Sequence, residues 1–391
     1  MNKTDNDTVA SRLMVQTQRL KSEGFTGGII WAALQTKDGV RLFLGEGAPI
    51  QANGQGLLTA AQELLSACPE LGAVLFTTPE YCVKAAKTLK SIPPVLDDMA
   101  QIVGPRADIL DGGDPARLVR KMKGRFACIV RESGQTPSGA LSAGRSLDQA
   151  VTAALVLEKS ARVYALASGL GGAKPLGKLD ALLMHFVYTK KYSRISAAAA
   201  HRCASDAGRE ISAEELSLRQ SMVDTCIALV EQNLVQGTWG NMSVRLDERY
   251  MLATPSGMDY DTLTPYDIVR VDMRTLEYEG GLKPTSEKGF HACIYLEHAD
   301  VNCVIHAHSP YASVYAAAHA PLKGDAFEAR VAGYGLPGTK TLKRNVCAAI
   351  KDNRACIMEN HGLLVCGPSI EYAAALCRDV ESAGVRFLKG N

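Results

Sequence analysis

Two stretches of this 391-residue sequence, ACPELGAVLFTTPEYCVKAA at 67–86 and EHADVNCVIHAHSPYASVYA at 297–316, align without a gap at an offset of 230. Each has a polar turn, an apolar run rich in β-forming residues, a proline, and a tyrosine that opens an alanine-rich helical segment. Further blocks repeat in the same order, because 127–133 matches 355–361 and 142–167 matches 365–388. We interpret this pattern as a tandem duplication.

The start of the second copy is marked by a helix signal. Ser212 and Glu215 have the spacing of a capping box, and an apolar stripe at helical spacing follows them. We therefore expect one domain over 1–195, a linker over 196–211 and a second domain over 212–391. Short β-rich runs, separated by helices and by turns such as LDER and NHG, predict an α/β fold with a largely antiparallel sheet.

The composition limits the kinds of partner and the cellular compartment that we expect for this protein. A net charge of +2, with 21% charged and 47% hydrophobic residues, gives no basic surface for nucleic acid or for a membrane. The N-terminal residues are polar, and we find no apolar run long enough to span a bilayer. The eleven cysteines include no CxxC pair and are typical of reduced, buried thiols, so we expect a cytoplasmic protein.

Within VIHAHSP (304–310), His306 and His308 stand two positions apart in a predicted strand. Side chains at such positions point to the same face, so both imidazoles can meet one metal ion, although such a pair can also simply pack. His361, in the turn of ENHGLLV (359–365), can complete a set of three. Three imidazoles with an open position are typical of catalytic zinc, with Mn²⁺, Co²⁺ or Ni²⁺ as other possible ions. We expect the other histidines, including His291 and His319, to pack or to lie at the surface.

Three further blocks carry amides and hydroxyls at turns or at the start of a predicted helix: GTWGNMS (237–243), ATPSGMDY (253–260) and KPTSEKGFH (283–291). Each residue alone fits a turn or a cap, but together they predict a site for phosphate or another anion. The candidates are Asn241, Ser256, Gly257, Thr285 and Ser286. Glu287, at the same helix start, fits either an acid that complements the helix dipole or a general acid or base.

The first copy lacks this chemistry. At the offset of 230, Phe76 and Thr78 take the places of His306 and His308, and Leu57 takes the place of Glu287. The turn ENHG of the second copy aligns with RESG. Since the apolar pattern persists while the histidines and the acid are lost together, we predict that the first copy keeps only the scaffold.

The blocks GTWGNMS, ATPSGMDY, KPTSE, HAH and ENHG, in this order and spacing, resemble the class II aldolase/adducin family. The resemblance covers about 215–388 with its motifs, and 10–190 as a degenerate copy. It implies a three-layer α/β/α sandwich around a mainly antiparallel sheet, present twice in tandem. It also implies zinc bound by His306, His308 and His361, with Glu287 as the acid or base. The phosphate is then expected at the five anion-binding candidates.

The resemblance implies a class II aldolase-type lyase. Such an enzyme cleaves or forms a C–C bond of a small phosphorylated ketose or hydroxy-ketone through a zinc-stabilised enediolate, with dihydroxyacetone phosphate as one product. The segment 324–340 is shorter than in the family, and Tyr334 is the candidate for the family's aldehyde-binding tyrosine. The chain also ends soon after its last helix, without the family's C-terminal tail. These departures bear on the aldehyde end of the substrate.

Two other functions stay open on the same residues. One is a metal-dependent sugar-phosphate epimerase, dehydratase or decarboxylase, and the other is a non-catalytic, adducin-like assembly protein. Because sites in the family lie between subunits of a four-fold ring, the resemblance also implies a homo-oligomer. That oligomer would be a dimer in which the degenerate copies replace alternate subunits, or a larger assembly.

Overall fold

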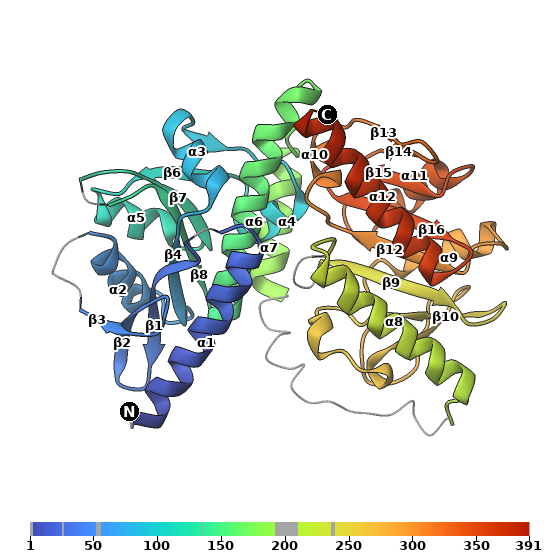
Figure 1. Ribbon diagram of the computed structural model, residues 1–391, viewed down its shortest axis with the longest axis horizontal. Coiled ribbons are helices and arrows are strands. Elements are labelled where there is room, and N and C mark those ends of the chain that lie inside the picture. Colours follow the sequence, from blue (N-terminus) through green and yellow to red (C-terminus); the bar gives the residue numbers. More distant parts are fainter. Residues whose placement is uncertain are drawn as a thin grey trace. The chain divides into compact units, whose positions relative to one another are not determined.

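The computed structural model describes residues 3–25, 27–51, 56–134, 136–191, 210–235 and 239–390 (Figure 1). The chain forms two compact units. The first comprises Met1–Ala165 and Pro175–Thr189, and the second comprises Leu166–Lys174 and Lys190–Asn391. Only residues 210 and 211 of the predicted linker 196–211 lie within the described residues.

The first unit contains a sheet of eight strands in the order β3-β2-β1-β4-β8-β7-β6-β5. Only the pair β6 and β7 is parallel. Its strands are β1 (Ile29–Thr36), β2 (Gly39–Leu44), β3 (Pro49–Ile50), β4 (Ala73–Thr77), β5 (Ser91–Ile92), β6 (Ala107–Asp111), β7 (Ala127–Arg131) and β8 (Gly139–Gly144). Its helices are α1 (Lys3–Ser22), α2 (Leu57–Ala67), α3 (Glu80–Thr88), α4 (Asp97–Ile102), α5 (Pro115–Met122), α6 (Leu147–Leu166) and α7 (Lys178–Lys191).

The second unit contains a sheet with the equivalent order, β11-β10-β9-β12-β16-β15-β14-β13, in which only β14 and β15 are parallel. Its strands are β9 (Gly240–Arg245), β10 (Tyr250–Ala253), β11 (Val269–Asp272), β12 (Cys303–Ala307), β13 (Leu322–Lys323), β14 (Glu328–Ala332), β15 (Ala355–Met358) and β16 (Gly362–Gly367). Its helices are α8 (Ala213–Glu231), α9 (Lys288–Glu297), α10 (Ala312–Ala318), α11 (Lys340–Ile350) and α12 (Ile370–Lys389), with short 3₁₀ turns at Ala167–Leu170, Tyr260–Thr262 and Pro265–Asp267.

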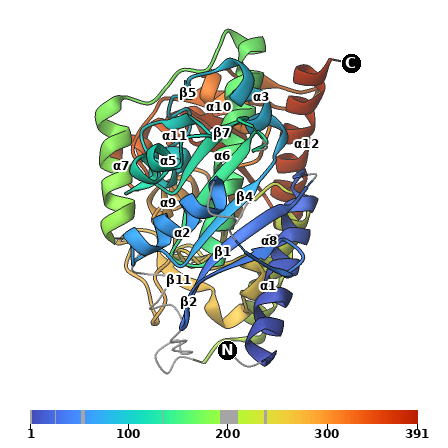
Figure 2. The ribbon, with the colours of Figure 1, turned by 90° about the vertical axis from the view of Figure 1, so that its left-hand side faces the viewer.

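Helices cover both faces of each sheet. In the second unit, alternate residues of β12 belong to different cores, because Ile305 packs with α8 and α12 while Val304 packs with α9 and α11. Figure 1 shows α8 and α12 along one face of β9, β12 and β16. In the first unit, α1 and α6 cover one face, and α2 and α5, visible in Figure 2, cover the other. The predicted three-layer α/β/α sandwich, present twice, is therefore confirmed.

Local signals in the sequence agree with these elements. The side chain of Ser212 accepts a hydrogen bond from the N–H of Glu215, so α8 begins where the capping box predicted. The repeated stretches form β4 and β12, which begin and end at an offset of 230 residues. Among the helices of the described residues, none has the length and apolar composition needed to cross a membrane.

Both units also have a carboxylate at the same place, buried in the first unit (Glu158) and half-buried in the second (Glu381). Glu158 accepts hydrogen bonds from the backbone N–H groups of Tyr81 and Cys82, each at 2.9 Å. In the second unit, Glu381 accepts from the N–H groups of Tyr311 and Ala312, at 2.8 and 2.9 Å. Each carboxylate thus satisfies donors at the segment that follows the central strand, which supports the duplication independently of strand order.

Candidate metal centre and anion-binding loops

The central strand β12 places His306 in the middle of the second sheet. His306 lies opposite Asn241 of β9 on one side and Leu364 of β16 on the other. Its side chain points to the face covered by α9, where the ring lies edge-on to Phe290 with centroids 6.3 Å apart. His308 follows directly after the end of β12, and His361 directly precedes β16. Two neighbouring strands therefore carry all three histidines to one end of the sheet.

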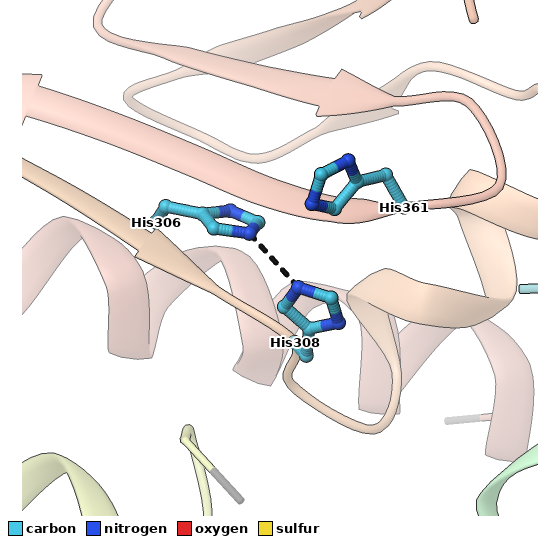
Figure 3. A group of neighbouring side chains, drawn as sticks. All are labelled: His306, His308 and His361. Atoms are coloured by element: carbon cyan, nitrogen blue, oxygen red, sulfur yellow. Dashed lines mark hydrogen bonds between the residues drawn. The ribbon is translucent and has the colours of Figure 1, made fainter. Parts of the chain in front are cut away.

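The three imidazoles converge, as Figure 3 shows. The Nε2 atoms of His306 and His308 are 2.9 Å apart. The ring centroid of His361 lies 4.7 Å from that of His306 and 5.0 Å from that of His308. All three side chains are buried, with exposed fractions of 1%, 4% and 3% for His306, His308 and His361. The structure therefore brings together the three histidines that the sequence singled out.

A backbone carbonyl orients the His306 ring. Its Nδ1 lies 2.9 Å from the carbonyl oxygen of Leu363. Because a carbonyl oxygen can only accept, Nδ1 carries the hydrogen, and in the neutral ring Nε2 keeps its lone pair. That lone pair faces the centre of the histidine cluster. A carbonyl on the outer nitrogen is typical of metal-binding histidines.

Glu287 lies beside the histidine cluster. Its carboxylate oxygens are 3.5 Å from His306 Nε2 and 3.3 Å from His361 Nε2, and the residue is 6% exposed. Burial alone raises the pKa of this carboxyl group, but the positive charge that His306 and His361 carry when protonated, together with the amide of Asn241, lowers it to about 2. The helix α9 begins one residue later than Glu287, so this acid is the N-cap residue and not part of the first turn.

A chain of buried hydrogen bonds fixes the orientation of Glu287. Asn241 Nδ2 donates to Glu287 Oε2 at 2.8 Å, and Asn241 Oδ1 lies 2.6 Å from His291 Nε2. The other ring nitrogen of His291 lies 2.7 Å from Ser243 Oγ, which in turn is 2.9 Å from the hydroxyl of Tyr295. Since an amide oxygen only accepts, His291 Nε2 must donate, and Ser243 then donates to Nδ1. The hydroxyl of Tyr295 has a single hydrogen, which it shares between Ser243 Oγ and the backbone carbonyl oxygen of Ser243, 2.8 Å away.

We predicted no role for Ser243 or Tyr295, and we expected His291 only to pack or to lie at the surface, whereas it is fully buried within this network. Burial lowers the pKa of His291 to about 3, so its ring is neutral at ordinary pH. A signal was nevertheless present, because Glu287, His291 and Tyr295 are spaced four residues apart. At that spacing they share one face of a helix, and a polar face directed at a sheet requires polar partners on the strands.

Asn241 lies on β9, and the other four predicted anion-binding residues lie on two neighbouring loops. The segments around Pro255 and Pro284 form an antiparallel bridge, and the N–H of Ser256 donates to the carbonyl of Lys283 at 2.8 Å. Gly257 has φ 76°, a conformation that favours glycine, and the space beside its Cα is open. Thr285 is buried and accepts from the N–H of Glu287, whereas Ser286 is exposed. Thr285 and Ser286 thus precede α9 and do not belong to it.

The loop with Tyr334 is tied to the turn that carries His361. The N–H of Tyr334 donates to Glu359 Oε2 at 2.9 Å, and the Tyr334 side chain is half-buried. The next residue of the turn, Asn360, has φ 54°, and its side chain donates to the carbonyl of Lys174 at 2.7 Å and contacts His319 Nε2 at 2.8 Å. Lys174 and His319 therefore hold the turn that presents His361.

Comparison with known proteins identifies the family. The family described as Class II Aldolase and Adducin N-terminal domain matches residues 58–165 and 220–384. The chain belongs to this family, and the match to both halves is consistent with the duplication.

Two curated relatives are aldolases by name. The chain is 34% identical over 183 residues to the L-fuculose phosphate aldolase of Escherichia coli O6:H1, covering 45% of this chain and 84% of that protein. It is 32% identical over 180 residues to the 5-methylthioribulose-1-phosphate/5-deoxyribulose-1-phosphate aldolase of Rhodospirillum rubrum, covering 44% and 80%. A solved structure of L-fuculose 1-phosphate aldolase matches with 32% identity and a TM-score of 0.43, covering 46% of this chain and 87% of that one. The prediction of an aldolase-type lyase is confirmed at the level of the family and of these relatives.

The donor set fits a divalent cation. Three buried imidazoles direct ring nitrogens toward one another, and the lone pair of His306 has been assigned by its bond to Leu363. The carboxylate oxygens of Glu287 lie 3.5 Å from His306 Nε2 and 3.3 Å from His361 Nε2. Neutral nitrogen donors beside a negative charge, closed off from water, form favourable surroundings for a positive ion.

Proposed function

We propose that the second unit is a metal-dependent lyase that cleaves or forms a C–C bond in a small phosphorylated ketose or hydroxy-ketone. The observation that carries this proposal is the placement of three buried imidazoles against an ionised, hydrogen-bonded carboxylate. The family and the names of the two aldolases support the reaction type. The proposal includes dihydroxyacetone phosphate as one cleavage product.

We assign the metal ligands to His306, His308 and His361, and the ion to Zn²⁺, with Mn²⁺, Co²⁺ or Ni²⁺ as substitutes. When bound, such an ion supplies Lewis acidity, which stabilises negative charge on oxygen. The bond from Leu363 orients His306, and the bonds of Asn360 to Lys174 and His319 hold the turn of His361. These bonds support the assignment, because they orient the His306 ring and hold the turn of His361 before any ion binds.

Glu287 is the proposed acid or base. In the cleavage direction it returns a proton to the carbon next to the carbonyl, and in the condensation direction it removes that proton. Asn241 donates to Oε2, so this oxygen is held in place. Oε1 faces His361 and forms no hydrogen bond in the described part of the chain. We propose that Oε1 is the oxygen that handles the proton.

The phosphate group of the substrate is assigned to the two loops beside Glu287. Ser256, Thr285 and Ser286 offer hydroxyl donors, and Gly257 allows close approach of the backbone. Asn241 has a second amide hydrogen besides the one given to Glu287, so it remains part of this anion-binding group. Tyr334 is proposed for the aldehyde end, because its loop is bonded to Glu359, two residues before His361.

The first test is a screen of short ketose 1-phosphates. Release of dihydroxyacetone phosphate is measured by its coupled reduction, with the wild-type chain and with Glu287→Gln. We expect release from at least one ketose phosphate, slowed by about 10²–10⁴-fold in the variant, since that range is typical for a general acid or base. Formation of an isomer or of a dehydrated product, without dihydroxyacetone phosphate, would show that the protein is an epimerase or a dehydratase and not a lyase.

We also propose that the protein acts as a cytoplasmic homo-oligomer. The ten cysteines of the described residues are buried and form no disulfide, as expected for a reducing compartment. Light scattering measures the mass of the particle in solution, and we expect at least twice the 41.8 kDa of the chain. An active particle with the mass of a single chain would contradict the oligomer.

A further inference from the structure

A second group of metal-binding side chains lies outside the histidine cluster. Cys293 and Glu297 lie four residues apart on α9, and Cys347 lies on α11. Their donor atoms, two sulfurs and a carboxylate oxygen, all lie within 4.8 Å of one another. Cys293 Sγ donates to Glu297 Oε1 at 3.2 Å, and the thiol of Cys347 forms a hydrogen bond with Cys293. We call these three residues the thiol cluster.

The thiol cluster lies at the wall of a cavity. Cys293 and Cys347 are 9% and 7% exposed, whereas Glu297 is exposed. All three line a cavity of about 890 Å³. The cavity gives an ion and its water a path to both sulfurs, and the two thiols are shielded from bulk solvent.

The hydrogen bond to Cys293, burial and Glu297 raise the pKa of the Cys347 thiol, and positive charge at the wall of the cavity opposes this rise. Four cationic side chains also line the cavity: Lys340, Lys343, Arg344 and Lys351. Nearby positive charge stabilises a thiolate relative to a thiol, and the thiolate is the form that binds metal. Two thiolates and a carboxylate carry three negative charges, so binding of a divalent ion leaves a net charge of −1. The cationic side chains that line the cavity balance this charge.

We propose that the thiol cluster is a second metal site, which takes a borderline-soft divalent ion of the Zn²⁺ type. Thiolate sulfur is the donor that selects such ions over Mg²⁺ and Ca²⁺. Binding replaces the two thiol protons, which pass to solvent, so affinity rises with pH. Three protein donors leave one position of a tetrahedral ion open toward the cavity.

This site is independent of the proposed lyase. Among the described residues, only the histidine cluster and the thiol cluster place three such donors within reach of one ion. The aligned positions of Cys293 and Glu297 in the first unit are Glu63 and Ala67, so the thiol cluster belongs to the second unit alone. A variant that loses one of the two metal sites can therefore still be tested for metal binding at the other.

The experiment is a Co²⁺ titration of the reduced, full-length chain without oxygen. Thiolate ligands give Co²⁺ an intense ultraviolet charge-transfer absorption that imidazole ligands lack. We expect this band in the wild type and in His306→Ala/His308→Ala, and its loss in Cys293→Ser/Cys347→Ser. Glu297→Gln should weaken Co²⁺ binding by at least about tenfold, because loss of even an outer-sphere partner costs 10–100-fold. Cys68→Ser, a buried thiol of the first unit, is the matched control and should keep the band.

Added Zn²⁺ should displace the Co²⁺ and abolish the band. Circular dichroism verifies that each variant is folded, and the single variant Cys347→Ala replaces the double variant if that one does not fold. Absence of the band in the folded, reduced wild type would overturn the proposal. Persistence of the band in Cys293→Ser/Cys347→Ser would also overturn the proposal. So would the finding that two thiols of the isolated chain react only after reduction, because it would indicate a disulfide in place of a metal site.

Discussion

The pair Trp31 and Phe76 in the first sheet occupies the same place between neighbouring strands as the pair Asn241 and His306 in the second. In the first unit the two rings stack with centroids 5.6 Å apart. In the second unit the same place holds an amide and an imidazole directed at a carboxylate. The strand order on either side is equivalent, so this position tolerates either apolar packing or polar chemistry.

The difference extends through the whole buried chain of hydrogen bonds. In the second unit its members are Glu287, Asn241, His291, Ser243 and Tyr295. The residues at the corresponding positions of the first unit are Leu57, Trp31, Ala61, Ala33 and Leu65. All five of these belong to one hydrophobic core. A buried polar network holds only when each member is satisfied, so its replacement as a set is physically expected.

The largest effect should come from giving the second unit the residues of the first. In His306→Phe/His308→Thr, we expect cleavage of the ketose phosphate to fall by about 10³-fold or more, because a Lewis acid contributes several kcal/mol. Turnover of the substrate found in the screen is the measurement. A rate within tenfold of the wild type would mean that the histidines have no part in catalysis.

A second comparison uses the carboxylate that both units share. Glu158→Ala and Glu381→Ala each leave two buried or partly buried N–H groups without this acceptor, so each should lower the free energy of unfolding by about 2–4 kcal/mol. Denaturant unfolding followed by circular dichroism measures both. Glu80→Ala, an exposed acid of the first unit, is the control and should change stability by less than about 0.5 kcal/mol. A loss in only one of the two units would break the equivalence.

A further effect, which appears only below pH 6.5, concerns stability in acid. His291 has a folded pKa of about 3, below the 6.5 of a free histidine, so the unfolded chain binds the proton first as the pH falls. Its contribution is therefore absent above pH 6.5 and destabilises the fold by about 1.4 kcal/mol per pH unit between 6.5 and 3. Stability of His291→Gln measured across this range should fall less steeply than that of the wild type. Equal slopes would show that His291 does not govern acid stability.

The sequence predicted the sandwich and the histidine cluster because both depend on local rules. Alternation in a strand places His306 and His308 on one side, and the repeat at an offset of 230 exposes the duplication without any coordinates. The partners of Glu287 could not be predicted in the same way. The bond between Asn241 and Glu287 depends on how β9 pairs with β12 and how α9 packs across them, which is tertiary information.

Two other structural details could not be predicted from the sequence for the same reason. The beginning of α9 at Lys288, and not at Thr285, depends on the bridge between two loops that lie about thirty residues apart in sequence. The role of Lys174, whose carbonyl holds Asn360, is also invisible in the sequence, because 186 residues separate the two. Short-range patterns therefore found the donors, while the groups that orient them required the structure.

We propose that the second unit carries a metal site that the first unit lacks. The most direct measurement is metal content by plasma mass spectrometry, on the wild type, on His306→Ala/His308→Ala and on the first-unit control Thr78→Ala. We predict that the double variant holds about one equivalent of zinc or a related ion less than the wild type, since one ion is shared by three imidazoles. The control should equal the wild type. Equal metal content in the wild type and the folded double variant would show that the histidine cluster binds no metal.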